Sequence, residues 1–417
     1  MHIAIVGSGI SGLTCAYLLH RGHDVVLYEA DDRAGGHSHT HRVDLPDATV
    51  NVDTGFLVYN ERTYPLFSLL LQQLDVATEP SDMSFSMSDE LTGTEWRGTS
   101  LSTVFAQRRN LVRPAFLVML ADIARFNRLA LRLLEDPPGD EVTLEEVLAR
   151  HRWSPGFRDW YLVPLGSSIW SASPATFTTI PATTFARFFE RHGLLKVVGQ
   201  PCWRTISGGA QTYVRAILAP LVSEGRVRLG MPVDKVRREG DGVELVGPAG
   251  AERFDHVIMA THSVQALQLL SDPDRVERTV LGAFPYQANR ATLHTDASLM
   301  PRRRRAWASW NYRRLDRETD RATLTYHVNR LQNISSPTPL LVTLNQDDAI
   351  APESVIARMD YDHPVLGPAA ISAQKRHAEL NGRRRTWFCG AYWGYGFHED
   401  GVRSAVETCR ALAGVTL

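Results

Sequence analysis

The residues with the most specific chemistry stand near the start of the chain, where glycines recur at the spacing GxGxxG. These glycines are Gly7, Gly9 and Gly12, and Ile10 and Ser11 lie between them. The first glycine permits a tight turn, the second lets backbone approach a pyrophosphate, and the third lets a helix pack closely on a strand. The free N–H groups and positive dipole end of the following helix then face the phosphates.

The elements that must hold this loop are a strand before it and a helix after it. Residues 2–6 form a short apolar run that predicts a buried strand, and residues 13–19 predict the helix. A second predicted strand, 24–28, is followed by Glu29, 17 residues after Gly12. A carboxylate at this position accepts hydrogen bonds from the ribose hydroxyls of an adenosine. The unit therefore predicts dinucleotide binding.

A further glycine pair follows the acidic residue and helps to distinguish FAD from NAD. The segment runs from Ala30 to Arg33 and then through Gly35 and Gly36 to His37. It resembles the extended fingerprint of the flavin-containing amine oxidase superfamily, in which the glycine pair lets the chain pass close to the FAD pyrophosphate and ribityl. That family usually has Arg where this chain has His37. The resemblance implies non-covalent FAD, with residues of this segment among its contacts.

Further segments resemble this superfamily in the order in which its motifs occur. The FAD contacts that this implies are Thr54, Gly55, Phe56, Val233, Ala260, Thr261, Gly390, Asp400, Gly401 and Val402. Residues 52–56 resemble the segment beside the flavin ring, and Val233 lies in the strand whose backbone pairs with adenine. Residues 387–391 and 399–405 resemble the last FAD segment, where the N-terminus of a helix faces the flavin pyrimidine oxygen.

The positions of these matches divide the chain into two discontinuous domains. The FAD-binding domain takes residues 1–60, 196–268 and 384–417, and the substrate or cap domain takes 61–195 and 269–383. The predicted fold class is α/β, with a Rossmann-like FAD-binding domain of the glutathione-reductase type and a second, α+β domain. Alternating apolar segments predict antiparallel strands in the cap domain at 291–295, 306–312, 322–328 and 340–343.

Three side chains are candidates for the chemistry beside the flavin. His398 takes the position at which we align an aromatic residue of the amine oxidase substrate cage, and we predict that it moves a proton or holds a polar group. The alternative is a histidine that only begins a helix. Tyr395 lies in the same aromatic segment, and Tyr59 follows the flavin-flanking segment. Tyr395 belongs either to the substrate cage or to the core, and Tyr59 either faces the substrate or forms part of a capped turn before the helix predicted at 64–74.

Metal binding and covalent flavin attachment are both disfavoured. His37, His39 and His41 alternate as ligands on one strand face would, but no cysteine or carboxylate cluster accompanies them. The four cysteines are far apart in the sequence and lack a CxxC pair, which argues against a zinc site or a disulfide framework and favours a reducing cytoplasm. We expect Cys389, in the last FAD segment, to be a buried apolar residue.

Charge and hydropathy limit the partners. Lys plus Arg total 45 and Asp plus Glu 46, so the net charge of −1 provides no field that recruits nucleic acid. The N-terminal residues lack the pattern of a secretory signal, and no apolar stretch is long enough to span a bilayer, so a cytoplasmic location is expected. Arginines surround the apolar run 115–121, which indicates either solvated cap helices or a surface that contacts anionic lipid.

The segments at 387–391 and 396–401 resemble most closely a bacterial branch of the superfamily that is often encoded beside cyclopropane-fatty-acyl-type methyltransferases. This resemblance implies an FAD-dependent oxidoreductase that takes hydride from an apolar substrate, an unsaturated or methyl-modified fatty acyl chain. No second GxGxxG offers a separate nicotinamide site. Two alternatives stay open: a flavin amine oxidase acting on a primary or secondary amine, and a flavin-binding partner subunit of a lipid methyltransferase.

Overall fold

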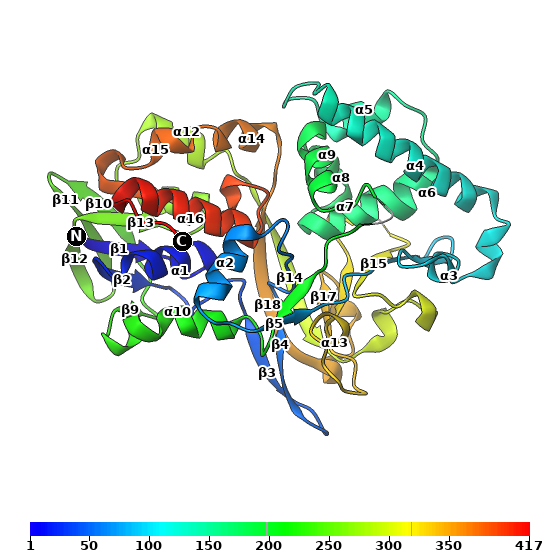
Figure 1. Ribbon diagram of the computed structural model, residues 1–417, viewed down its shortest axis with the longest axis horizontal. Helices are drawn as coiled ribbons and strands as arrows, with labels where there is room; N and C mark the ends of the chain where they lie inside the picture. Colours follow the sequence, from blue (N-terminus) through cyan, green and yellow to red (C-terminus); the bar gives the residue numbers. More distant parts are fainter. Residues whose placement is uncertain (197–198, 318) are drawn as a thin grey trace.

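The protein, described here by a computed structural model over residues 1–196, 199–317 and 319–417, has two halves that lie side by side (Figure 1). One half is built on a parallel sheet with the strand order β19-β13-β1-β2-β9. Its strands are β1 (His2–Val6), β2 (Asp24–Tyr28), β9 (Val227–Arg228), β13 (His256–Met259) and β19 (Thr386–Phe388). The central strands are apolar along their length because both faces of the sheet are covered.

Alternate side chains of β1 point to opposite faces of this sheet. Ile3 and Ile5 belong to the core beneath three helices, α1 (Ile10–Leu19), α10 (Gln211–Ser223) and α16 (His398–Ala413). Ala4 and Val6 belong to the core on the other face. That face is covered in part by the antiparallel sheet of β10 (Lys235–Glu239), β11 (Gly242–Gly247) and β12 (Gly250–Phe254).

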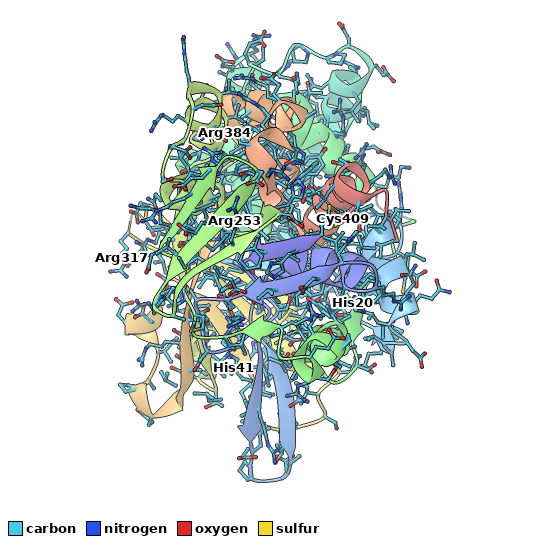
Figure 2. The ribbon with its side chains drawn as sticks, turned by 90° about the vertical axis from the view of Figure 1, so that its left-hand side faces the viewer. His20, His41, Arg253, Arg317, Arg384 and Cys409 are labelled. Atoms are coloured by element: carbon cyan, nitrogen blue, oxygen red, sulfur yellow. The ribbon has the colours of Figure 1, made fainter. Side chains whose placement is uncertain are left out.

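Two small sheets connect this half to the rest of the chain. The hairpin of β3 (Thr40–Asp44) and β4 (Thr49–Asp53) projects away from the parallel sheet (Figure 2). At its base, both carboxylate oxygens of Asp53 lie 3.0 Å from the Ala210 N–H, just before α10. The second small sheet pairs β5 (Thr78–Pro80) with β8 (Arg204–Ile206).

The other half contains a seven-stranded sheet with the order β18-β14-β17-β16-β15-β6-β7. Its strands are β6 (Phe85–Asp89), β7 (Thr94–Arg97), β14 (Tyr286–His294), β15 (Trp310–Arg314), β16 (Leu324–His327), β17 (Leu341–Leu344) and β18 (Val355–Pro364). Strands β14 to β17 confirm the four cap strands predicted from alternation, and they pair with one another antiparallel. Only their limits differ, by a few residues.

A group of helices lies beside this sheet, and the longest of them is α4 (Pro114–Glu135). The others are α3 (Leu101–Val104), α5 (Leu144–Ala149), α6 (Pro155–Phe157), α7 (Val163–Trp170), α8 (Pro174–Thr178) and α9 (Ala182–Arg191). Helix α3 packs near the sheet core, and the other helices share a core that contains the aromatic side chains of Phe126, Phe157 and Phe185. No helix in the described part of the chain is both long and apolar enough to cross a membrane.

The remaining helices pack on both halves of the molecule. These helices are α2 (Pro65–Gln73), α11 (Ser263–Leu269), α12 (Arg275–Leu281), α13 (Val328–Leu331), α14 (Pro368–Gln374) and α15 (His377–Leu380). Leu281, Ala370 and Leu380 share a core with Ala4 of β1, although residues 269–383 are assigned to the cap domain above. Helices α12, α14 and α15 therefore pack with the parallel-sheet half, because their apolar faces cover the side of the sheet opposite α1.

Candidate active site

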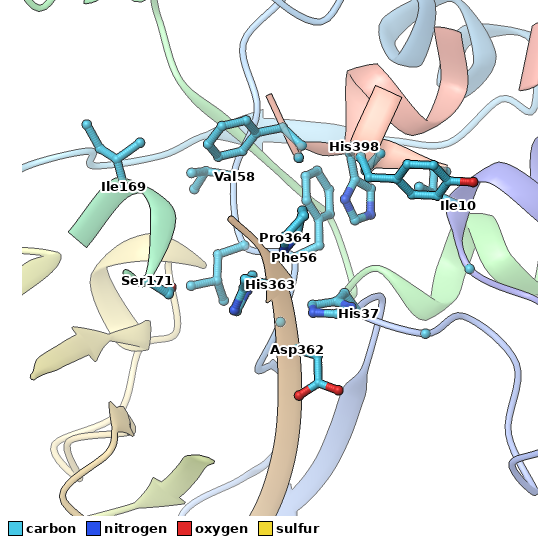
Figure 3. A pocket seen from close by; sticks show the side chains of 18 of the residues that line it. Ile10, His37, Phe56, Val58, Ile169, Ser171, Asp362, His363, Pro364 and His398 are labelled. Atoms are coloured by element: carbon cyan, nitrogen blue, oxygen red, sulfur yellow. The ribbon is translucent and has the colours of Figure 1, made fainter. Parts of the chain in front are cut away.

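A cavity of about 420 Å³ lies where the glycine-rich loop meets the cap helices (Figure 3). Gly7, Ala260 and Gly390 line it, and they follow the neighbouring strands β1, β13 and β19. The cavity is therefore at the carboxyl ends of parallel strands, where α/β sheets bind their ligands. Its other end is lined by the cap helices, with Ile169 from α7 and Phe188 from α9.

Two of the loop glycines are required by the fold itself. Gly7 has φ +102°, and a Cβ atom there would lie 2.8 Å from the carbonyl oxygen of Ala260. A Cβ at Gly12 would overlap the carbonyl oxygen of Gly7. Gly9 differs, because a Cβ there would meet no atom within 4 Å and the residue lines the cavity. Gly7 and Gly12 thus shape the turn, while Gly9 leaves backbone open to a ligand.

Glu29 borders the same end of the cavity, as the sequence predicts. Its Oε2 accepts hydrogen bonds from the Ser8 N–H at 2.9 Å and the Ser8 hydroxyl at 2.5 Å. Its Oε1 accepts one from the Asp31 N–H at 3.0 Å. These bonds fix the carboxylate beside the phosphate-binding loop and leave lone pairs for further donors such as ribose hydroxyls.

Unpaired polar atoms give a second test of whether a dinucleotide fits here. His37 lines the cavity, and its Nε2 is buried without a hydrogen-bond partner among the described residues. The same holds for Nη1 of Arg33, four residues earlier. Burying such groups unpaired is costly, so they indicate a bound group rich in acceptor oxygens. The donor set and the open backbone at Gly9 fit the phosphates and hydroxyls of FAD.

The structure brings most of the predicted FAD contacts to this one cavity. Those that line it are Gly7, Gly9, Ile10, Ser11, Glu29, Gly35, Gly36, His37, Gly55, Phe56, Ala260, Thr261 and Gly390. The others, among described residues, lie outside the lining: Gly12, Ala30, Arg33, Thr54, Val233, Asp400, Gly401 and Val402. Val233 instead lines a smaller cavity beside β11 and β12.

The three predicted contacts on α16 have structural roles in this arrangement. The carboxylate of Asp400 accepts hydrogen bonds from the N–H groups of Tyr395 and Phe397 and so caps the start of α16. Gly401 packs against α1, and its carbonyl accepts a 3.0 Å hydrogen bond from the Ser11 hydroxyl. Val402 is fully buried. These contacts hold the N-termini of α1 and α16 side by side at the cavity.

His398 is the first residue of α16 and lines the cavity. Its ring stacks on Phe56 with the centroids 3.6 Å apart (Figure 3), and its Nε2 lies 3.1 Å from the Ser38 hydroxyl and 3.2 Å from the Tyr213 hydroxyl. Burial lowers the pKa of His398 to about 3. The imidazole is therefore neutral near pH 7, and any proton role has to be performed by the neutral ring.

The two predicted tyrosines do not reach the cavity. Tyr59 is 3% exposed and packs its ring against Tyr64 and Phe67 in the core beneath the parallel sheet. Tyr395 packs against Phe188 and is absent from the described lining. The aromatic residue that does line the cavity just before α16 is Phe397. Phe397 thus lines the cavity next to His398, the residue predicted for the cage position.

Sequence reasoning also missed His363, which β18 places in the lining beside His37 (Figure 3). The Nδ2 amide of Asn289 lies 3.0 Å from His363 Nδ1. The orientation of that amide is set by Asn345, whose Nδ2 donates to Asn289 Oδ1 at 2.8 Å. Nδ1 of His363 is therefore the acceptor and Nε2 carries the hydrogen. Burial lowers the pKa of His363 to about 4, so this neutral form persists.

His192 is a second missed histidine, and it is held in the opposite tautomer. It follows α9 and lines the cavity, and its Nδ1–H donates to the Phe188 carbonyl at 2.9 Å. Its pKa is lowered to about 4, mainly by burial. Nε2 is then an unprotonated acceptor with no hydrogen-bond partner among the described residues. No local motif marks either histidine, because their roles depend on residues distant in the sequence.

The cap end of the cavity is mostly apolar. Its lining includes Met83, Phe85, Leu165, Ile169, Leu194, Trp203, Trp310 and Tyr326, with Ser84, Ser171 and Gln200 as polar members. Glu29 and Asp362 are the only charged residues in the described lining, and neither belongs to the cap helices. A substrate bound at this end would therefore bury apolar surface without meeting a charged partner.

Other chemical candidates lie away from the cavity. The sulfur of Cys389 is 3.8 Å from that of Cys15, and both are buried between α1 and β19. Lys375 forms an ion pair with Asp140 on the surface. His39 and His41 pack ring to ring, 4.0 Å apart. Within the described residues, no group of three or more His, Cys, Asp or Glu side chains is arranged to hold a metal.

The fold and the cavity together define the class of FAD-binding oxidoreductases with a capped dinucleotide site. Residues 10–308 match the family of flavin-containing amine oxidoreductases, and the chain belongs to this family. It is therefore an FAD-dependent oxidoreductase, and the residues at the glycine-rich end of the cavity fit FAD.

Similar proteins agree with this assignment. A protein of Mycobacterium tuberculosis assigned as a flavin-containing monoamine oxidase, AofH, is 28% identical over 65% of this chain, which spans about three-fifths (59%) of that relative's length. The fold resembles cyclohexylamine oxidase from Brevibacterium oxydans (TM-score 0.71, 18% identity) over 99% of this chain and 98% of that one. It resembles a fatty acid isomerase from P. acnes equally (TM-score 0.70, 15% identity), with the same coverage.

Proposed function

We propose that this FAD-dependent oxidoreductase takes hydride from an apolar substrate, an unsaturated or methyl-modified fatty acyl chain. The observation that carries the proposal is the cap end of the cavity, where Leu165, Ile169 and Trp310 belong to a lining without a charged cap residue. Burying an acyl chain there gains about 25 cal/mol for each Å² removed from water. A charged ammonium would lose its hydration without a compensating carboxylate.

FAD supplies an acceptor for the hydride and its two electrons. The residues of this chain position the substrate, exclude water and move the proton. Loss of hydride from one carbon and of a proton from its neighbour leaves a new double bond in the acyl chain. Two neutral imidazoles of the lining, His192 and His398, are candidate acceptors for that proton, and His192 Nε2 has no hydrogen-bond partner among the described residues. His363 offers an N–H that can orient a polar group of the substrate.

Oxidation of a neutral amine is the second candidate, and Phe397 favours it. An aromatic residue stands just before α16, where the cage position of the resembled amine oxidases is expected, and Phe188 packs against it with centroids 5.3 Å apart. Phe397 and Phe188 can therefore serve as an aromatic wall for such a substrate. An uncharged amine with an apolar substituent also suits the cap lining.

An anaerobic flavin-reduction assay on the holoenzyme distinguishes acyl-chain oxidation from amine oxidation. Linoleate and its methyl ester are the acyl probes, cyclohexylamine and benzylamine are the amine probes, and stearate is the saturated control. We expect bleaching of the flavin absorbance by an acyl probe, which Ile169→Asp abolishes without loss of FAD. Bleaching by the amines alone would replace the acyl proposal with the amine reading.

Bleaching by no probe would favour the third reading, a flavin-binding partner subunit of a lipid methyltransferase. That reading needs its own positive result. Co-purification of the chain with such a methyltransferase, in a complex that survives gel filtration, would be that result. The reduction assay and the complex assay are independent, so each reading has an outcome that contradicts it.

A further inference from the structure

We infer that the outer face of the cap helices, formed by residues 101–132, binds the surface of an anionic lipid bilayer. Six large apolar side chains are exposed there: Leu101, Leu111, Val112, Leu117, Val118 and Leu131. Leu101 is 80% exposed and Val112 is 81% exposed. Single exposed apolar residues are ordinary on a protein surface, but a cluster in one short segment marks an interaction site.

The spacing along α4 places two of these residues, Leu117 and Leu131, on one side of the helix. Leu117, Ala121, Ala124, Arg128 and Leu131 are all exposed and follow one another at intervals of three or four residues. Phe116, Met119 and Phe126 occupy the opposite face and are fully buried in the cap. The exposed stripe is therefore a continuous surface in addition to the helix's core face, as in helices that lie on a membrane.

The charge of this surface complements anionic headgroups. Residues 101–132 contain six arginines and a single carboxylate, Asp122. That carboxylate is buried, forms an ion pair with Arg125 and accepts a hydrogen bond from the Ser154 N–H at 2.9 Å. Arg128 and Arg132 are exposed and make no ion pair within the described residues. The whole chain carries a net charge of −1, so this positive surface is a local segregation of charge.

The position of the surface suits an enzyme that takes an apolar substrate from a bilayer. This part of the inference rests on the proposed function. Helix α4 lies on the side of the molecule away from the parallel sheet (Figure 1) and packs on α9. Phe188 of α9 lines the cavity. The same helical layer thus has one side at the substrate cavity and the other at the basic surface. Binding to the bilayer itself does not depend on the reaction.

Flotation of the holoenzyme with lipid vesicles tests the inference directly. We expect binding to vesicles of phosphatidylcholine with phosphatidylglycerol, weaker binding in high salt, and little binding to phosphatidylcholine alone. Arg128→Glu/Arg132→Glu and Val112→Ser/Leu117→Ser should each weaken binding about tenfold or more. Matched controls on the parallel-sheet half, Arg21→Glu/Arg215→Glu and Val222→Ser/Leu229→Ser, should change it less than about twofold.

Three results would overturn the inference. The first is no binding of the unmodified holoenzyme to the anionic vesicles, and the second is equal loss in the control variants, which would indicate a general charge effect. The third is an unmodified dimer that Val112→Ser/Leu117→Ser converts to a monomer, as measured by light scattering, because this surface would then join two copies of the chain. Retained flavin absorbance in each variant confirms that it is folded. Since vesicle binding and flavin reduction are measured separately, failure of one leaves the other intact.

Discussion

Glu29 stands immediately after β2 and is the residue whose role in FAD binding can be measured most simply. Its carboxylate is fixed by Ser8 and Asp31 at the edge of the cavity. We predict that Glu29→Ala weakens FAD binding about 10- to 150-fold, since hydrogen bonds to a charged group contribute about 1.5–3 kcal/mol. Asp31→Ala is the control, because only the Asp31 backbone takes part. Titration of apoprotein with FAD, followed by flavin fluorescence, gives both affinities.

His398 poses a different question, because its position agrees with a role near the flavin while its environment keeps it neutral. His398→Phe preserves the stacking on Phe56 and removes the contacts to Ser38 and Tyr213. We predict that FAD stays bound and that flavin reduction by the substrate slows about 100-fold or more. In the unmodified enzyme the rate should show no step from His398 between pH 5 and 9, because its pKa of about 3 lies far below.

Stopped-flow reduction at several pH values checks this prediction. If the rate of flavin reduction changes by less than about threefold in His398→Phe, His398 has only a structural role at the start of α16. A rate step near pH 6.5 that the substitution removes would instead show that the ring is hydrated and titrates normally. His192→Phe is the useful comparison, since it removes the other acceptor nitrogen from the cavity.

Residues whose roles depend on a short continuous motif could be predicted from the sequence. Residues whose roles depend on contacts with distant parts of the chain could not. The loop glycines and Glu29 form one continuous motif, so their spacing alone indicates dinucleotide binding. The tautomer of His363 depends on Asn289, which is 74 positions away in the sequence. Tyr59 is placed beside the flavin segment in sequence, yet the chain turns and buries it.

At the scale of elements, the strand–loop–helix unit from β1 to α1 gives three glycines with separable roles. Gly12→Ala places a methyl group against the Gly7 carbonyl, so we predict loss of the folded unit. Gly9→Ala meets no protein atom and should fold while losing FAD. Gly22→Ala, also without a neighbour within 4 Å, should affect neither. Circular dichroism with flavin content measured on the same samples distinguishes these outcomes. A Gly9→Ala variant that keeps FAD would contradict the proposed FAD site at the glycine-rich end of the cavity.

The helices and strands were easier to predict than the elements on which they pack. Strands β14 to β17 follow from alternating apolar residues, because one face of their sheet is buried. The apolar faces of α12 and α14 are equally visible in the sequence. Nothing in a helical pattern, however, says which of two sheets it covers, and both helices pack on the parallel sheet. The sheet on which these helices pack therefore could not be predicted from their apolar pattern alone.

At the scale of the molecule, the cores hold an unusual number of neutral histidines, which makes stability depend on pH. Burial lowers the pKa of His39 and His398 to about 3 and that of His192, His294, His327 and His363 to about 4. An unfolded chain protonates them near pH 6.5. The unfolded state therefore binds more protons than the folded one below pH 6.5, and these groups destabilise the fold as the pH falls from about 6.5 to 4.

Two buried carboxylates act in the opposite direction. Burial raises the pKa of Asp53 and of Glu399 to about 7. Their contribution is fully present below the unfolded value of about 4 and is lost as the pH rises through 7. Each group contributes at most about 1.4 kcal/mol per pH unit. The six histidines outnumber these two carboxylates, so the histidines should determine the sign of the change in stability with pH.

We therefore predict that the melting temperature of the holoenzyme falls as the pH is lowered from 6.5 to 5. His294→Asn should make the melting temperature depend less on pH, because it removes one of the buried imidazoles. His294 lies away from the cavity, and an amide can replace the contact between its Nε2 and the Thr343 hydroxyl, which is 2.7 Å long. His151→Asn, at an exposed position, should leave this pH dependence unchanged. Differential scanning fluorimetry across this pH range, at one FAD concentration, measures all three proteins. A melting temperature that rises toward pH 5 would mean that Asp53 and Glu399 dominate, and that the histidines are hydrated in solution.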